Sequence, residues 1–193
     1  MKDLYKKETF YMRNDKVQKL TLTALFLAIG LVLPFITGQI PTIGNMLLPM
    51  HIPVFLCAMI CGWRYGLPMA AILPILRSFV FGFPPLYPNA IVMAFELATY
   101  AFVLGFLYER AKNQNVGVIY RCMIIAMIVG RIVWGVVKWG LLGAAGDAFT
   151  INAFIAGGFL NAIPGIIIQL ILIPAIIVAL DRAKLVPFKK TAN

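Results

Sequence analysis

The chain has 193 residues, of which 62% are hydrophobic and only 12% are charged. Soluble domains are closer to half apolar and a quarter charged, so the composition excludes a soluble globular domain, a disordered chain and a nucleic-acid-binding module. The net charge is +10 at pH 7. In so apolar a chain the basic residues must flank apolar segments, and we interpret them as determinants of membrane topology. A single His and three Cys inside apolar runs give no disulfide framework and no multi-His metal site, so no metal or cofactor is expected.

A membrane-spanning helix needs about 20 mostly apolar residues to cross about 30 Å of hydrocarbon. By this criterion we predict an all-α integral membrane protein, a six-transmembrane-helix bundle in one domain covering residues 1–193. In chain order the expected spans are 17–37, 49–63, 66–82, 88–108, 117–141 and a sixth that begins between Asn152 and Asn161 and ends at Leu180. The second and third spans are short and contain Pro53, Pro68 and Pro74, so neighbouring helices must satisfy their backbone.

The distribution of basic residues predicts an N-in, C-in orientation, because Lys and Arg concentrate on the cytoplasmic side of a membrane. Residues 1–16 then form a cytoplasmic N-terminal segment and residues 181–193 a cytoplasmic tail. In this orientation 14 of the 17 basic residues lie at the inner ends of spans, the exceptions being Arg77, Arg131 and Lys138. We therefore expect a multi-pass protein of the cell membrane. Its partly apolar outer connections, 38–48 and 142–158, are interpreted either as covers over a cavity or as ordinary loops.

Four charged side chains are predicted to lie in the middle or outer half of the membrane, given the helical rise of about 1.5 Å per residue. Such groups are costly in lipid and usually face a bundle interior or a cavity. We expect Arg77 and Glu96 to form an ion pair between adjacent spans. Arg131 and Lys138 then have no acidic partner at their depth apart from Asp147 in the outer segment. Two such cations suit an anionic ligand, because a carboxylate can accept a bidentate bond from Arg.

Polar and aromatic residues of the last three spans complete a predicted site for a small polar ligand. Residues three or four apart share one helix face, which groups Glu96 with Tyr100 and Arg131 with Trp134 and Lys138. The candidate substrate-binding residues are therefore Asn89, Glu96, Tyr100, Arg131, Trp134, Lys138 and Asn161. Gln169 is a further polar residue of the sixth span. His51 begins the second span at the outer face and is interpreted as a local hydrogen-bonding residue.

Motifs of metalloproteases, serine hydrolases and nucleotide-binding proteins are absent from the sequence. No catalytic residue is assigned, and the chain is not expected to be an enzyme. If transport is driven by ATP, the motor must be another subunit.

The first span places two small residues four apart, Ala24 and Ala28. Small residues at this spacing allow a second helix to approach closely in lipid.

The size, the six spans, the Ala24–Ala28 face and the runs LPMHIPVFLCAMICGWRYG and PILRSFVFGFPPLYPNAIVMAFELATY resemble the substrate-binding S component of energy-coupling-factor (ECF) vitamin transporters, in particular its pantothenate branch. The resemblance implies that Ala24 and Ala28 contact a membrane-embedded coupling subunit driven by two ATPases. It also implies that the loop 38–48 covers a vitamin bound from outside, in a pocket formed by the outer halves of spans four to six. In this family the S component is thought to topple in the membrane to release the vitamin inside.

The sequence leaves the vitamin open. Pantothenate carries a carboxylate, an amide and two hydroxyls, which fit the inventory above, and folate, biotin, pyridoxine and niacin are alternatives. A stand-alone ion-coupled secondary transporter is the alternative from another class, with Glu96 as the acidic candidate in its core. Uptake driven by an ion gradient, in vesicles without any ATPase, would favour that alternative.

Overall fold

The structure is a computed structural model that describes residues 2–36, 46–146, 150–158, 160–186 and 188. The elements among these residues are all helical, as the sequence predicts. The helices are α1 (Lys2–Ile36), α3 (His51–Ile60), α4 (Trp63–Phe81), α5 (Ile91–Arg110), α6 (Val116–Ala144), α7 (Ile151–Gly158) and α8 (Ile163–Arg182). A π-helical turn, Leu86–Ala90, leads into α5, and a 3-10 turn, Leu160–Ala162, leads into α8.

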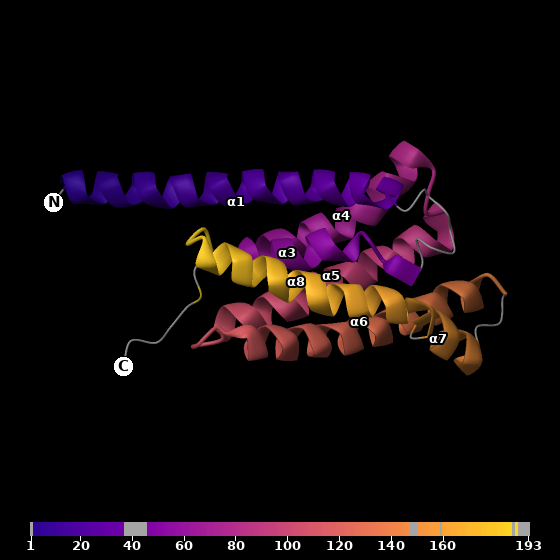
Figure 1. The fold of residues 1–193 in the computed structure, drawn as a ribbon. Coiled ribbons are helices and arrows are strands. Elements are labelled where there is room, and N and C mark those ends of the chain that lie inside the picture. Colours follow the sequence, from indigo (N-terminus) through magenta and orange to yellow (C-terminus); the bar gives the residue numbers. More distant parts are fainter. Residues whose placement is uncertain (1, 37–45, 147–149, 159, 187, 189–193) are drawn as a thin grey trace.

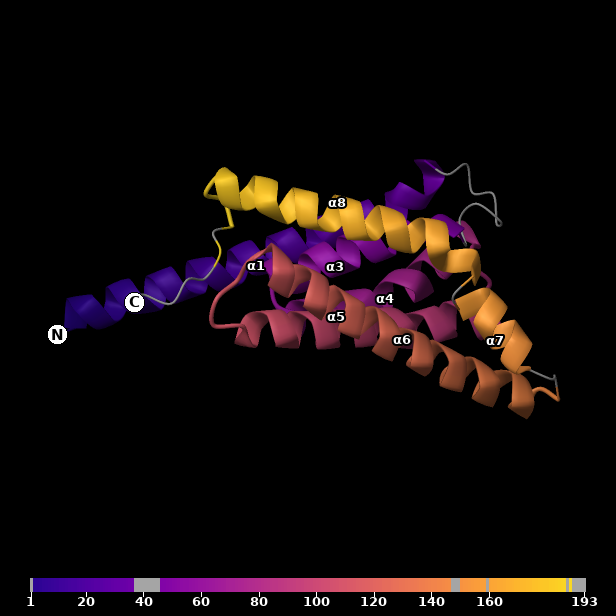
Figure 2. The ribbon, with the colours of Figure 1, turned by 60° about the horizontal axis from the view of Figure 1, so that its bottom comes forward.

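The helices form an elongated bundle in which α1, α3, α4, α5, α6 and α8 alternate in direction (Figure 1). The N-terminal part of α1 runs well beyond the ends of the other helices. At the opposite end of the bundle, α7 joins the end of α6 to the start of α8, and it keeps this place in both views (Figures 1 and 2). The start of α1 and the end of α8 lie toward the same end of the bundle, so the chain has the alternating topology of a multi-pass membrane protein.

Four helical stretches are long and apolar enough to cross a membrane, namely Asp15–Phe35, Leu86–Arg110, Val116–Ala144 and Ile151–Arg182. The helix α4 has 19 residues but carries Arg64 and Arg77, which lower its hydropathy. The helix α3 has ten residues, or about 15 Å of helix, which is about half the hydrocarbon thickness. Six complete crossings and the N-in, C-in orientation therefore remain predictions.

The sixth segment begins later than the sequence suggests. The helix α6 continues to Ala144, α7 is a separate short helix, and α8 begins at Ile163 rather than between Asn152 and Asn161. Apolar residues continue through α7 and α8, so hydropathy gives no break between them. The turn Leu160–Ala162 separates the two helices.

Glycine and asparagine define several of the helix ends. Gly62 has a φ of 91°, a backbone conformation that favours glycine, and it links α3 to α4. Gly82 follows α4 with a φ of 69°, and its N–H donates to the Ser78 carbonyl at 2.9 Å, as in a left-handed helix C-cap. At the start of α6 the Asn115 side chain accepts from the backbone N–H of Val118 at 2.9 Å, which satisfies one of the unpaired donors of that helix end.

The helix α5 lies at the centre of the bundle and packs against α3, α4 and α6. Its buried face includes Leu97 and Leu104, both 0% exposed. By contrast, large apolar side chains on the outside are open, with Val136 62% and Ile171 65% exposed. An apolar exterior of this kind suits hydrocarbon as the surrounding solvent.

Candidate ligand-binding site

Four polar side chains meet in the interior of the bundle around one carboxylate. Glu96 Oε1 lies 2.8 Å from Arg131 Nη1 and accepts a hydrogen bond from the Tyr100 hydroxyl at 2.9 Å. His51 Nε2 lies 3.7 Å from the same oxygen. All four residues are at most 4% exposed. We call His51, Glu96, Tyr100 and Arg131 the ionic cluster.

Three helices supply the ionic cluster. Glu96 and Tyr100 lie one turn apart on α5, Arg131 comes from α6, and His51 is the first residue of α3. The Tyr100 ring lies 5.3 Å from that of Phe55 and 5.4 Å from that of His51. On its other side a Cβ atom at Gly130 would overlap the Tyr100 ring. A glycine is therefore required at position 130 for α6 to approach α5 this closely.

The expected ion pair between Arg77 and Glu96 is wrong, because Glu96 pairs with Arg131 instead. Arg77 Nη1 donates to the Leu31 carbonyl of α1, and its guanidinium lies 5.0 Å and 5.3 Å from the ring centres of Phe35 and Phe81. The expectation that Arg131 lacks an acidic partner is wrong for the same reason. The depth of these charges along their spans stays a prediction, and the rotation of each helix decides which of them meet.

Lys138 lies over Trp134, and these two residues follow Arg131 on α6 by two turns and one turn respectively. Its Nζ atom is 4.7 Å from the Trp134 ring centre, within the range of a cation–π contact. Trp134 is 8% exposed, Lys138 is half-buried, and Lys138 is close enough to Glu96 for electrostatic attraction. The structure thus brings five of the seven predicted substrate-binding residues to one region, namely Glu96, Tyr100, Arg131, Trp134 and Lys138.

The other two predicted substrate-binding residues, Asn89 and Asn161, are exposed at the ends of their segments, and the structure does not bring them into the ionic cluster. Ala24 and Ala28 are exposed on α1, as a docking face requires. Asp147 and most of the loop 38–48 lie outside the described residues, as does part of the segment 142–158.

Sequence reasoning missed the place of His51 in the ionic cluster. Neither ring nitrogen of His51 has a hydrogen-bond partner among the described residues, and the same holds for Nε2 of Gln169, which is 1% exposed. Buried polar groups are normally hydrogen-bonded, so these atoms mark positions where a further polar partner would be favourable. The position of His51 at the start of an apolar span was the signal that could have placed it in the site.

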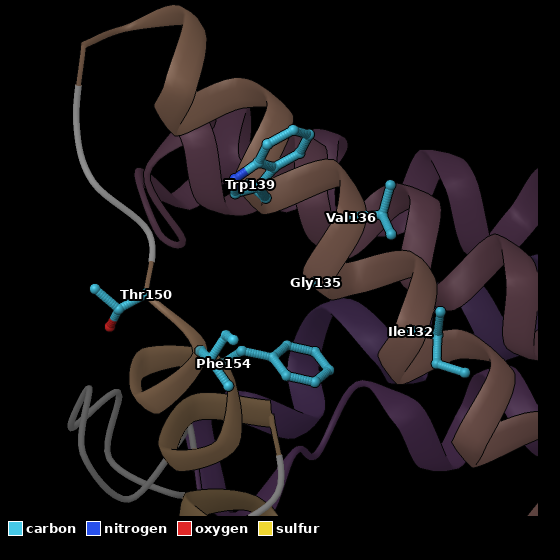
Figure 3. Close-up of a pocket in the computed structure, with 7 residues that line it drawn as sticks. Ile132, Gly135, Val136, Trp139, Thr150 and Phe154 are labelled. Atoms are coloured by element: carbon cyan, nitrogen blue, oxygen red, sulfur yellow. The ribbon is translucent and has the colours of Figure 1, made fainter.

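A groove of about 400 Å³ lies between α6 and α7, outside the ionic cluster. Figure 3 shows the Phe154 ring of α7 directed toward α6, where a Cβ atom at Gly135 would overlap it. The Phe154 ring also lies 6.2 Å from that of Trp134. The groove is lined by Ile132, Gly135, Val136, Trp139, Thr150, Ile151 and Phe154, none of which belongs to the predicted substrate-binding set. Its walls are apolar and open, so this groove suits hydrocarbon rather than an anion.

Within the described part of the chain, no group of three His, Cys, Asp or Glu side chains could hold a metal ion. The chemistry of the ionic cluster is that of hydrogen bonding and charge pairing. A carboxylate that accepts from two neighbours, a buried imidazole with open nitrogens and a nearby ammonium group can orient a small polar solute.

A multi-pass helical bundle with a buried ionic cluster is the architecture of a membrane protein that binds or transports a small solute. The family model of the ECF transporter substrate-specific component matches residues 18–177, most of the chain, and the chain belongs to this family. Its members are membrane proteins that bind small-molecule substrates and work with a membrane coupling subunit and ATPases, and they are not enzymes. The resemblance to S components is thereby confirmed. Comparison with curated proteins and with solved structures gives no match.

Proposed function

We propose that the chain is the S component that captures a small anionic vitamin from outside, with pantothenate as the best candidate, and delivers it inward with a membrane coupling subunit and two ATPases. The observation that carries this proposal is the ionic cluster, with Trp134 one turn and Lys138 two turns beyond Arg131 on α6. Buried ionisable groups of this kind are expensive in a membrane and mark functional sites.

The charge balance of the site supports a ligand with a single carboxylate. Arg131 and Glu96 form a close pair and offset each other, and Lys138 adds a positive charge at the half-buried end of the site. We assign the carboxylate of the vitamin to Lys138. The hydroxyl and amide groups of pantothenate match the open nitrogens of His51 and the accepting oxygens of Glu96. Arg131 then acts mainly by holding Glu96 in place.

The helix α7 supports a covered site. Its Phe154 packs at Gly135 and beside Trp134, and a Cβ atom at Gly157 would lie 3.2 Å from the Trp134 ring. In this proposal α7 covers the outer side of Trp134 and keeps lipid away from the vitamin. Displacement of Phe154 would therefore open the site to the groove between α6 and α7.

Calorimetry on the purified chain, without ATP, tests the substrate assignment. We expect pantothenate to bind at least about tenfold more tightly than folate, biotin, pyridoxine or niacin, a difference of about 1.4 kcal/mol. Tight binding of another of these vitamins would replace pantothenate in the proposal. Binding of none of them would contradict the vitamin assignment. Uptake driven by an ion gradient, in vesicles without ATPases, would instead support the secondary transporter.

The exposed Ala24–Ala28 face of α1 supports docking of the coupling subunit. Replacing both residues with Trp keeps α1 apolar but holds a partner helix away, so close packing is lost. We expect vitamin binding by the isolated chain to be unchanged, whereas co-purification with the coupling subunit and ATP-driven uptake collapse. The matched control is the double substitution Ala175→Trp and Ala179→Trp, because these residues have the same spacing and are exposed on α8. Equal loss in both double variants would contradict the assignment to α1.

A further inference from the structure

Arg77 is fully buried between α1 and α4, yet it has no carboxylate partner among the described residues. Its Nη1 atom donates to the Leu31 carbonyl, its Nη2 atom has no hydrogen-bond partner there, and its guanidinium faces the rings of Phe35 and Phe81. These two rings meet edge to face, with their centres 4.9 Å apart. The cation is therefore enclosed by one carbonyl and two aromatic rings that belong to both helices.

The ends of α1 and α4 explain how a cation is tolerated here. Both helices run toward the same end of the bundle (Figure 1), and Arg77 lies one turn before the end of α4. The C-terminal end of a helix carries the negative end of its dipole, and Leu31 lies in the last two turns of α1. Pro34 of α1 has no N–H, so the carbonyl of Gly30, the residue before Leu31, lacks its i+4 donor within α1. The aromatic faces add negative charge density.

The contacts of Arg77 fall on the same stripe of α1 as the docking face. Residues 24, 28, 31 and 35 follow one another at helical spacing, so they lie along one side of α1. At its outer end this stripe is held against α4 by Arg77, through Leu31 and Phe35. One turn before Arg77 on α4, Leu73 packs so closely on Gly30, the residue before Leu31, that a Cβ atom at Gly30 would lie 2.7 Å from it. At its inner end the stripe is open at Ala24 and Ala28.

We propose that Arg77 is a positioning residue for energy coupling, which holds the outer third of α1 against α4 and so presents the Ala24–Ala28 face to the coupling subunit at a fixed angle. This inference rests on the proposed function, because it assumes that α1 is the docking helix. It assigns Arg77 no contact with the vitamin. In this proposal Arg77 acts in coupling, whereas Arg131 belongs to the ligand site.

The test compares three variants in the complete transporter and in the isolated chain. Arg77→Gln removes the charge, Arg77→Lys keeps a cation that can donate to the Leu31 carbonyl, and Arg64→Gln is the control at the exposed start of the same helix. Three quantities are measured: affinity of the isolated chain for pantothenate, ATP-driven uptake by the assembled complex, and backbone hydrogen exchange across residues 26–35.

For Arg77→Gln we expect uptake to fall at least about tenfold while pantothenate affinity changes less than about twofold. Hydrogen exchange should rise in residues 26–35 and stay unchanged in α5 and α6. Arg77→Lys should recover most of the uptake, and Arg64→Gln should match the unmodified protein. Normal uptake in Arg77→Gln would overturn the proposal, as would a loss of affinity and protection throughout the chain. If the unmodified chain binds no pantothenate, the substrate assignment fails, and co-purification with the coupling subunit still tests Arg77.

Discussion

Two buried arginines among the described side chains, Arg77 and Arg131, are accommodated in opposite ways. Arg131 faces a carboxylate 2.8 Å away, in a cluster that also contains a tyrosine and a histidine. Arg77 faces a backbone carbonyl and two phenylalanine rings, without a carboxylate among the described residues. The first cation is paired by side-chain chemistry and the second by helix ends and aromatic faces. An arginine inside a membrane helix therefore does not by itself indicate an anionic ligand.

In the function that we propose, the two arginine regions serve different tasks, which are ligand binding near Arg131 and coupling near Arg77. The Arg131 region contains groups that can exchange a hydrogen bond with a solute, such as the open nitrogens of His51. The Arg77 region joins α1, the helix that we propose for docking, to the rest of the bundle. The following predictions disturb one region and compare the result with the other.

The largest effect is expected when Arg131 loses its carboxylate. Glu96→Ala leaves a buried guanidinium unpaired, which should lower the free energy of unfolding by about 3–5 kcal/mol. Thermal unfolding in detergent measures this change. Glu109→Ala, at the exposed end of the same helix, is the control and should lower the free energy of unfolding by less than about 1 kcal/mol, because interactions of exposed charges contribute little. Adding Arg131→Met to Glu96→Ala should restore much of the stability, and failure to do so would contradict the pairing as the cause.

Lys138→Gln should separate the cation that we assign to the vitamin carboxylate from the cation of Arg131, which is paired with Glu96. Loss of a charge-assisted contact to the vitamin carboxylate should weaken binding by about 1.5–3 kcal/mol. A second ligand sharpens this test, namely the pantothenate analogue in which an alcohol group replaces the carboxylate. Calorimetry should show that Lys138→Gln binds the two ligands with equal affinity. Arg121→Gln, exposed near the other end of α6, should keep the discrimination. A variant at Lys138 that still prefers the carboxylate would remove this residue from the site.

Gly130→Ala should displace Tyr100 from Glu96, since the added methyl group overlaps the tyrosine ring. Overpacking of this kind lowers stability by about 1–3 kcal/mol, and vitamin affinity should fall with it. The control is Gly140→Ala on the same helix, where an added Cβ meets no atom within 4 Å among the described residues. That substitution should be neutral or stabilise the helix by up to about 1 kcal/mol. Equal behaviour of the two variants in thermal unfolding would contradict the close approach of α5 and α6.

The smallest effect is expected when one of the two aromatic rings beside Arg77 is removed. Phe81→Leu keeps an apolar side chain but removes one ring face, which should lower the free energy of unfolding by about 0.5–1 kcal/mol. Phe79→Leu, two residues earlier and 73% exposed, is the matched control. The same thermal measurement distinguishes the two. A loss as large as that of Glu96→Ala would mean that Arg77 depends on this ring more than on the helix ends.

Much of the architecture follows from the sequence, because hydropathy and helical spacing are local properties. The expected fifth span, 117–141, lies within α6 (Val116–Ala144) and differs from it by at most three residues at either end. The spacing of Glu96 and Tyr100 correctly predicts that they share a face, and the structure adds a hydrogen bond between them. The same holds for Trp134 and Lys138 on α6.

The rest of the site depends on how the helices are rotated against one another, which local spacing does not determine. Glu96 reaches Arg131 rather than Arg77 because its face of α5 points at α6, and Gly130 allows that approach. His51 enters the cluster because α3 begins beside α5. Asn89 and Asn161 are polar residues near span ends, and polarity alone did not indicate that both are exposed.

The length of α1 gives the contact at Arg77 a mechanical meaning. Its 35 residues extend over about 52 Å, whereas the hydrocarbon is about 30 Å thick, so the helix is an arm that protrudes from the bundle (Figure 1). Arg77 holds this arm at Leu31, about 44 Å from the opposite end at Lys2. If α1 tilted by about 10° around its contact with Arg77, the Lys2 end would move by about 8 Å. A small rearrangement between α1 and α4 would thereby be amplified at the end of the helix that we predict, from the charge distribution, to be cytoplasmic.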